Sequence, residues 1–107
     1  MTSTALRPTS VLPALQALAE PNRFQIVEAL RAGERCVCEL QDTLDVSQSL
    51  LSHHLRALRE AGLVADRREG RWVHYSLVPD ALSALEGFLA ALRTDAATAP
   101  PHPSCCP

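Results

Sequence analysis

The sequence predicts a mainly α-helical fold that carries one β-hairpin. Leu and Ala, which both favour helix, account for 17 and 16 of the 107 residues, whereas only four residues are aromatic. The spacing of apolar residues is helical up to Gly62, alternates after it, and becomes helical again after Pro79. A chain of this length suits one domain around one core. These observations predict an α+β class and exclude an all-β sandwich.

Four helices are expected before Gly62. Residues 1–10 are polar and are expected to be flexible. Pro21 suits the first turn of a helix, and Gly33 is a typical helix end. Ser47 is a typical N-cap, and Gly62 ends the helix that follows it. Between these markers the apolar spacing predicts helices over residues 11–19, 21–32, 37–44 and 47–61.

A hairpin and a fifth helix follow. Residues 63–68 and 71–78 flank Glu69-Gly70, and Val73, Tyr75 and Leu77 alternate with Trp72, His74 and Ser76, as in a two-stranded hairpin. Pro79-Asp80 opens the last helix, which is expected to end near Arg93. Its leucines are spaced three, four and three residues apart, like a coiled-coil seam. Residues 94–107 are rich in Ala, Thr and Pro and are expected to form a disordered tail.

The predicted element order is that of a winged helix-turn-helix. The short helix 37–44, a tight turn and the capped helix 47–61 form the two-helix unit, whose second helix enters the major groove of DNA. The hairpin is the wing beside it. We therefore expect one such domain over residues 11–93, with an order ααααββα, between a flexible N-terminus and the tail.

The charge distribution agrees with a local polyanion-binding face. The net charge is −2, and all ten basic residues are Arg. Residues 46–78 nevertheless carry five Arg against three acidic residues, between flanks that are each net acidic. No apolar run reaches the roughly 18 residues that span a bilayer. Residues 11–19 are interrupted by Pro13 and Gln16, unlike a signal peptide, so we expect a cytoplasmic chain.

Three motifs resemble the ArsR/SmtB family of bacterial metal-responsive repressors. They are CVCEL at residues 36–40, SQSLLSHHLRALREAGLV at 47–64 and GRWVHYSL at 70–77. The segment AEPNRFQIVEAL at 19–30 is also similar to the family, so that the resemblance covers about Leu15 to Leu92. It implies a homodimeric winged-helix repressor that leaves double-stranded operator DNA when an inducer binds, with no cofactor needed for folding.

Cys36 and Cys38 are the first candidate ligands. Thiolates select soft ions, among them trivalent arsenic and antimony, Cd(II) and Pb(II). On a regular helix, residues i and i+2 point about 200° apart, so both sulfurs can bind one ion only if the helix start is frayed or distorted. The alternative is that both are small, half-buried hydrophobic side chains. The resemblance favours a ligand role, with arsenite, methylarsenite or antimonite as the inducer.

The candidate site departs from the family pattern at Gln41. The arsenic sensors of the family usually carry a third Cys at this position. Cys105 and Cys106 in the tail are candidates for the missing thiolate, in the same or the partner subunit, although a redundant reactive pair is the alternative. His102 could add a ligand but is more simply a solvated side chain. The zinc site that some family members have in the last helix is not expected, because residues 80–93 contain no His.

Two further sets of residues are assigned by position. Polar side chains early in the recognition helix suit base and phosphate contacts, although Ser47 is also the N-cap, so part of its role is structural. The Arg residues around Gly70 suit phosphate contacts, and a solvated hairpin tip is the alternative. His54, Trp72, His74 and Tyr75 are assigned to packing. The candidate DNA contacts are Ser47, Gln48, Ser49, Ser52, His53, Arg56, Arg67, Arg68 and Arg71. The candidate dimer contacts are Leu12, Leu15, Leu82, Leu85, Leu89 and Leu92.

Three other functions remain open. The same fold could sense oxidants or persulfides through its thiols, or respond to Cd(II) or Pb(II). A thiol-rich protein that sequesters metal without binding DNA is a further alternative, which the basic wing argues against. An enzyme is not expected, because the sequence has no coherent set of nucleophile, base and orienting group.

Overall fold

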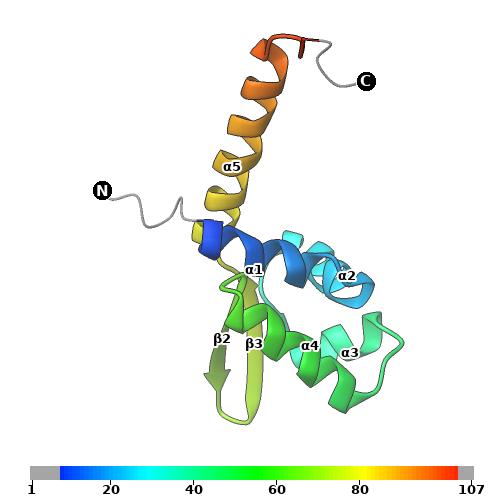
Figure 1. Cartoon of the computed structure of the whole chain (residues 1–107). Helices are drawn as coiled ribbons and strands as arrows, with labels where there is room; N and C mark the ends of the chain where they lie inside the picture. The colour runs from blue at the N-terminus through cyan, green and yellow to red at the C-terminus, as the bar shows by residue number, and fades with distance from the viewer. Residues whose placement is uncertain (1–7, 104–107) are drawn as a thin grey trace.

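The computed structural model describes residues 8–103 and confirms the predicted winged helix-turn-helix (Figure 1). Helices α1 to α4 pack together on one side of a small sheet, and α5 rises away from this body (Figure 1). None of the helices in the described part, α5 included, carries an apolar stretch long enough to cross a bilayer. The elements in chain order are α1 (Pro8–Leu18), α2 (Pro21–Ala29), the 3₁₀ turn η2 (Leu30–Ala32), β1 (Arg35–Cys36), α3 (Val37–Thr43), α4 (Gln48–Glu60), β2 (Val64–Glu69), β3 (Trp72–Leu77) and α5 (Pro79–Thr98).

The predicted boundary residues act as the sequence indicates. Ser47 is the N-cap of α4, and its Oγ accepts a hydrogen bond of 3.2 Å from the backbone N–H of Leu50. Gly33 caps the 3₁₀ turn η2 that follows α2, and Gly62 follows the C-cap of α4; their φ values are 131° and 81°, which residues other than glycine rarely adopt. The caps therefore set where α4, the predicted recognition helix, begins and ends.

The sheet has one strand more than the predicted hairpin. Its order is β1-β3-β2, with both pairs antiparallel. Arg35 and Cys36 form β1 and pair with Tyr75 and His74 of β3. A strand of two residues carries no alternating pattern, which explains why the sequence did not predict it. This short pairing places the first candidate thiol on the edge of the wing.

Three helix ends differ from the sequence prediction. Helix α2 ends at Ala29, and the 3₁₀ turn η2 takes the last three residues of the helix expected over 21–32. Helix α1 begins at Pro8, within the segment expected to be flexible, because proline is compatible with a first helical turn. Helix α5 continues to Thr98, five residues beyond the expected end at Arg93. Ala96 and Ala97 favour helix, and the helix stops just before Pro100. The assignment of residues 94–98 to an extended tail was therefore wrong; Cys105 and Cys106 lie outside the described residues.

The core joins the helices to the sheet. Six side chains are almost completely buried: Ile26, Leu40, Leu51, Leu55, Leu58 and Leu63. Ala84 and Leu85, near the start of α5, belong to the same core, and α5 packs against α1. The later leucines of α5 are exposed, because that half of the helix projects beyond the body (Figure 1). Within residues 8–103, the buried side chains of α5 thus lie in its first half.

His54 is a buried polar group on the inner face of α4. It is 5% exposed, and neither ring nitrogen has a hydrogen-bond partner among the described residues. Burial lowers the pKa of His54; Glu20, whose Oε1 lies 3.8 Å from Nδ1, opposes this shift, while Arg23 and His53 add to it. The imidazole is accordingly neutral in the folded protein at neutral pH.

This burial predicts a pH-dependent stability. The pKa of His54 rises to its ordinary value of about 6.5 on unfolding, so the unfolded chain binds the proton more readily. Above about pH 6.5, this group should not affect the free energy of unfolding. As the pH decreases below that value, the free energy of unfolding should decrease by at most about 1.4 kcal/mol per pH unit. The fall should stop below the folded-state pKa.

Urea unfolding at pH 7.5 and 5.5 measures this effect. His54→Leu should reduce the difference in unfolding free energy between the two pH values, whereas His53→Ala, which alters the exposed neighbour, should keep most of it, because burial is the largest cause of the shift. An equal pH dependence in the wild-type chain and in His54→Leu would contradict the assignment.

Candidate thiol site and nucleic-acid interface

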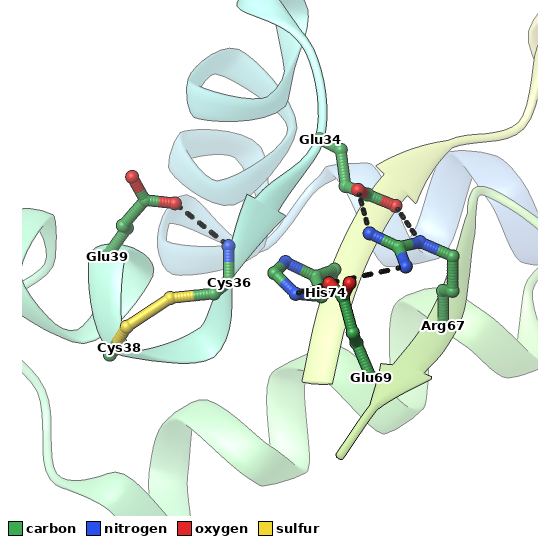
Figure 2. A network of polar contacts seen from close by, with 7 residues as sticks. All are labelled: Glu34, Cys36, Cys38, Glu39, Arg67, Glu69 and His74. Atoms are coloured by element: carbon green, nitrogen blue, oxygen red, sulfur yellow. Dashed lines mark hydrogen bonds and ion pairs between the residues drawn. A yellow bond between two sulfur atoms is a disulfide. The ribbon is translucent and has the colours of Figure 1, made fainter. Parts of the chain in front are cut away.

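Cys36 and Cys38 lie together at the start of α3. Cys36 is the N-cap residue, with an extended backbone (φ −79°, ψ 158°), and Cys38 is in the first helical turn. The two Cα atoms are 5.4 Å apart, and the sulfurs form a disulfide (Figure 2). The sequence led us to expect that the sulfurs can meet only where the helix start departs from a regular helix; the structure agrees, because Cys36 is extended and precedes α3. The chain therefore presents two converging sulfur atoms with a regular α3.

Backbone and side-chain hydrogen bonds hold this segment. The carboxylate Oε1 of Glu39 accepts a 2.9 Å hydrogen bond from the backbone N–H of Cys36, as in a capping box (Figure 2). Cys36 is only 8% exposed, whereas Cys38 is exposed. A reagent or ligand in solution therefore meets the pair from the side of Cys38.

A row of side chains crosses the sheet from the thiol to the wing. His74 of β3 is paired in register with Cys36 on one side and with Arg67 of β2 on the other. Side chains at paired positions share one face of a sheet. His74 Nε2 lies 3.5 Å from Glu69 Oε1, so that the row ends in a polar cluster (Figure 2).

Arg67 is engaged within the chain. Its guanidinium donates two hydrogen bonds to the carboxylate of Glu34, at 3.0 and 2.7 Å, and lies 3.6 Å from Glu69 (Figure 2). The hydrogen bonds from Arg67 lower the pKa of Glu34, and the same contact raises the pKa of Arg67. The sequence treated Arg67 as an equal of Arg68 and Arg71. The structure distinguishes Arg67 from Arg68 and Arg71, because the guanidinium of Arg67 already donates two hydrogen bonds to the carboxylate of Glu34.

Arg68 and Arg71 instead line a groove between α3, α4 and the wing. The groove has a volume of about 650 Å³. Arg56 and Arg59 of α4 face the same space, and Arg59 lies 3.5 Å from Asp66. The other three guanidinium groups have no carboxylate within ion-pair distance among the described residues. Cys38 and Gln41 of α3 also line this groove. The exposed thiol and the cationic surface therefore meet in one place.

The predicted DNA-contacting residues are all exposed. This holds for the candidates on α4 and at its cap, and for those on the wing. Gln48, Ser52 and Arg56 line the groove, whereas Ser47, Ser49 and His53 lie outside it. Arg59 and Trp72, which were not among the candidates, also line the groove; Trp72 is 53% exposed, rather than packed as expected. Tyr75, in contrast, is buried.

The six leucines proposed as dimer contacts fall into two groups. Leu85 is 6% exposed and belongs to the core of its own chain, and Leu15 and Leu82 pack partly against that core. Leu12, Leu89 and Leu92 are each about half exposed. They lie on α1 and α5, which pack against each other. Among the described residues, this second group is the more accessible to another chain.

The described residues hold no cluster of three or more His, Cys, Asp or Glu side chains arranged for a metal ion. Two thiols are therefore the candidate ligand set within residues 8–103. Cys105 and Cys106, proposed as further ligands, lie outside the described residues, and His102 is exposed with Nδ1 2.7 Å from the Pro103 carbonyl oxygen. A thiol pair suits an ion or element that needs only two bonds from protein.

The helices α3 and α4, with Ser47 capping α4, and the cationic wing beside them form a winged helix-turn-helix of the kind that regulators use to bind DNA. Residues 20–66 match the family described as bacterial regulatory protein, arsR family. A solved structure described as a possible transcriptional regulator for arsenical resistance has a TM-score of 0.70 and 36% identity, covering 84% of this chain and all of that one. The chain belongs to the ArsR family of bacterial regulatory proteins.

Curated relatives agree with this assignment. The arsenical resistance operon repressor of Escherichia coli (strain K12) is 52% identical over 63 residues, which are 58% of this chain and 54% of that protein. The transcriptional repressor SmtB homolog of Synechocystis is 51% identical over 61 residues, which are 57% of this chain and 46% of that protein. The match thus spans about half the length of these relatives. Both are transcriptional repressors by name, and neither is described as an enzyme.

Proposed function

We propose that this chain is a homodimeric transcriptional repressor of the cytoplasm that binds operator DNA and releases it when Cys36 and Cys38 bind a trivalent arsenic species. The observation that carries the proposal is the placement of the sulfurs. They converge at the start of α3, and Cys38 opens into the groove between α4 and the wing. Arsenite, methylarsenite and antimonite all form bonds to two thiolates.

The proposed DNA contacts follow from exposure and charge. The N-terminal part of α4 offers exposed polar side chains for base edges, and Arg56, Arg68 and Arg71 offer positive charge for phosphates. The names of the relatives support repression by operator binding. Because Cys38 borders the same groove, a ligand bound there lies beside the DNA-contacting surface.

The proposed dimer uses α1 and the free half of α5. Leu12, Leu89 and Leu92 are exposed on these helices, and Phe88 is 36% exposed next to Leu89. Exposed apolar side chains gathered on two packed helices are typical of a protein interface. A dimer would pair two recognition helices with a palindromic site.

A thiol redox sensor is the second candidate function, and the disulfide between Cys36 and Cys38 favours it. A peroxide would oxidise the two thiols to this disulfide and would itself be reduced to water. The oxidised pair has no thiolate free for arsenic, so the two inputs exclude each other at one site. Sensing of Cd(II) or Pb(II) needs more ligands than the described residues offer.

Cys36→Ser and Cys38→Ser test the proposed inducer site. Each variant should bind a duplex selected from random DNA with wild-type affinity, because the thiols do not contact DNA in this proposal. Neither should release it on addition of arsenite or methylarsenite, as measured by fluorescence anisotropy of labelled DNA. Normal release by both variants would refute the site, and release of the wild-type chain by peroxide alone would favour the redox function.

The wing arginines should contribute unequally to DNA binding. Arg68→Ala and Arg71→Ala should each weaken binding across sequences and reduce the slope of log affinity against log salt by about 0.9, the value for one phosphate contact. Arg67→Ala should change the slope less, because Glu34 and Glu69 already hold its charge. Anisotropy titrations between 50 and 200 mM salt would measure this; an equal slope change in all three variants would contradict the distinction.

Leu89→Glu tests the dimer interface. Because Leu89 is 52% exposed in its own chain, the variant should fold, yet a charge in an apolar interface should separate the subunits. Sedimentation should show monomers, and DNA affinity should fall by at least tenfold. Thr94→Glu, on the opposite side of α5, is the matched control and should remain dimeric. A dimeric Leu89→Glu variant would place the interface elsewhere.

A further inference from the structure

Gln41 lies one helical turn after Cys38 on the same side of α3. Residues three apart on a helix are neighbours, and both side chains line the groove between α3, α4 and the wing. A glutamine here is not itself a ligand for a soft element, because amide groups are hard donors. Its side chain nevertheless lines the same groove as Cys38.

The orientation of this amide is determined by its neighbours. Its Nε2 donates a hydrogen bond to the backbone carbonyl oxygen of Val46, in the turn before α4. A carbonyl oxygen accepts only, so the nitrogen must face Val46, and Oε1 must point the other way. Oε1 is buried and has no hydrogen-bond donor among the described residues. A buried acceptor without a donor is costly and rare in a folded protein.

The chemistry of a two-thiolate arsenic site supplies a donor of the required kind. Arsenous acid, As(OH)₃, reacts with two thiols to form two As–S bonds and releases two molecules of water, while arsenic remains trivalent. One As–OH group is left, and its hydrogen can be donated. Methylarsonous acid, CH₃As(OH)₂, reacts in the same way, but the third substituent on arsenic is then a methyl group, which cannot donate.

We infer that Gln41 is a specificity-determining residue, whose Oε1 accepts a hydrogen bond from the hydroxyl of arsenite bound to Cys36 and Cys38. This inference rests on the proposed function and names the residue that adapts a two-thiol site to inorganic arsenic. The hydrogen bond to Val46 fixes the amide, so that Oε1 remains the atom free to accept. Gln41 thus distinguishes the hydroxyl of arsenite from the methyl group of methylarsenite.

The test compares the two arsenicals in full-length variants after reduction with a phosphine. Binding to the free protein is measured by the ultraviolet absorbance of As–S bonds, and release is measured with labelled DNA. Gln41→Leu should weaken arsenite binding about three- to tenfold, the value of one hydrogen bond, and should leave methylarsenite binding unchanged. Gln41→Cys, which adds a third thiolate, should tighten arsenite binding only. Gln25→Leu, on the exposed face of α2, is the matched control.

Other outcomes would contradict either the role of Gln41 or the proposed function. If Gln41→Leu weakens both arsenicals equally, or neither, Gln41 does not accept the hydroxyl. If Cys105→Ser with Cys106→Ser abolishes arsenite binding in the otherwise wild-type chain, a tail thiolate takes the third position, and the inference is wrong. If the wild-type chain binds neither arsenical, the proposed function itself fails, which the methylarsenite titration shows independently of Gln41.

Discussion

The pairing of Arg35 and Cys36 with Tyr75 and His74 determines how the other elements meet. Without this strand pairing, α3 and the wing would be joined only through side-chain packing. The pairing holds Cys36 in an extended conformation at the edge of the wing, and α3 begins at the next residue. The extended N-cap is what allows Cys36 and Cys38 to converge. It also places Glu34 where it can bind Arg67 across the sheet.

The arrangement brings two chemistries into one groove. Cys38 and Gln41 come from α3, the arginines come from α4 and the wing, and the floor includes the buried side chains of Leu55 and Tyr75. Under the proposed function, the inducer therefore binds within the half of the molecule that contacts DNA, rather than in the α1 and α5 layer. The exposed leucines of α1 and α5 are left for the subunit contact. Inducer and dimer surfaces are thus separate, and the coupling acts through α3, α4 and the wing.

Local signals in the sequence predicted most of the fold. Ser47 and Gly62 bounded α4, and Gly70 marked the turn of the hairpin, because each position needs a particular cap or backbone conformation. What the sequence did not show depends on contacts between distant residues. The strand β1 is too short to carry a pattern, and the Arg67 to Glu34 pair joins residues 33 positions apart. The leucines of α5 repeat evenly, yet the body of the chain covers Leu85 and leaves Leu89 exposed.

The central claim is that the thiol pair and the DNA surface are coupled through this shared groove. Thermodynamic linkage requires the coupling to be reciprocal: DNA must weaken arsenical binding by the same factor by which the arsenical weakens DNA binding. Methylarsenite should be titrated into the reduced protein, alone and with saturating selected DNA, at one salt concentration. The account predicts a weaker affinity in the presence of DNA, with a factor equal to that measured for DNA release. The same methylarsenite affinity with and without DNA would contradict it.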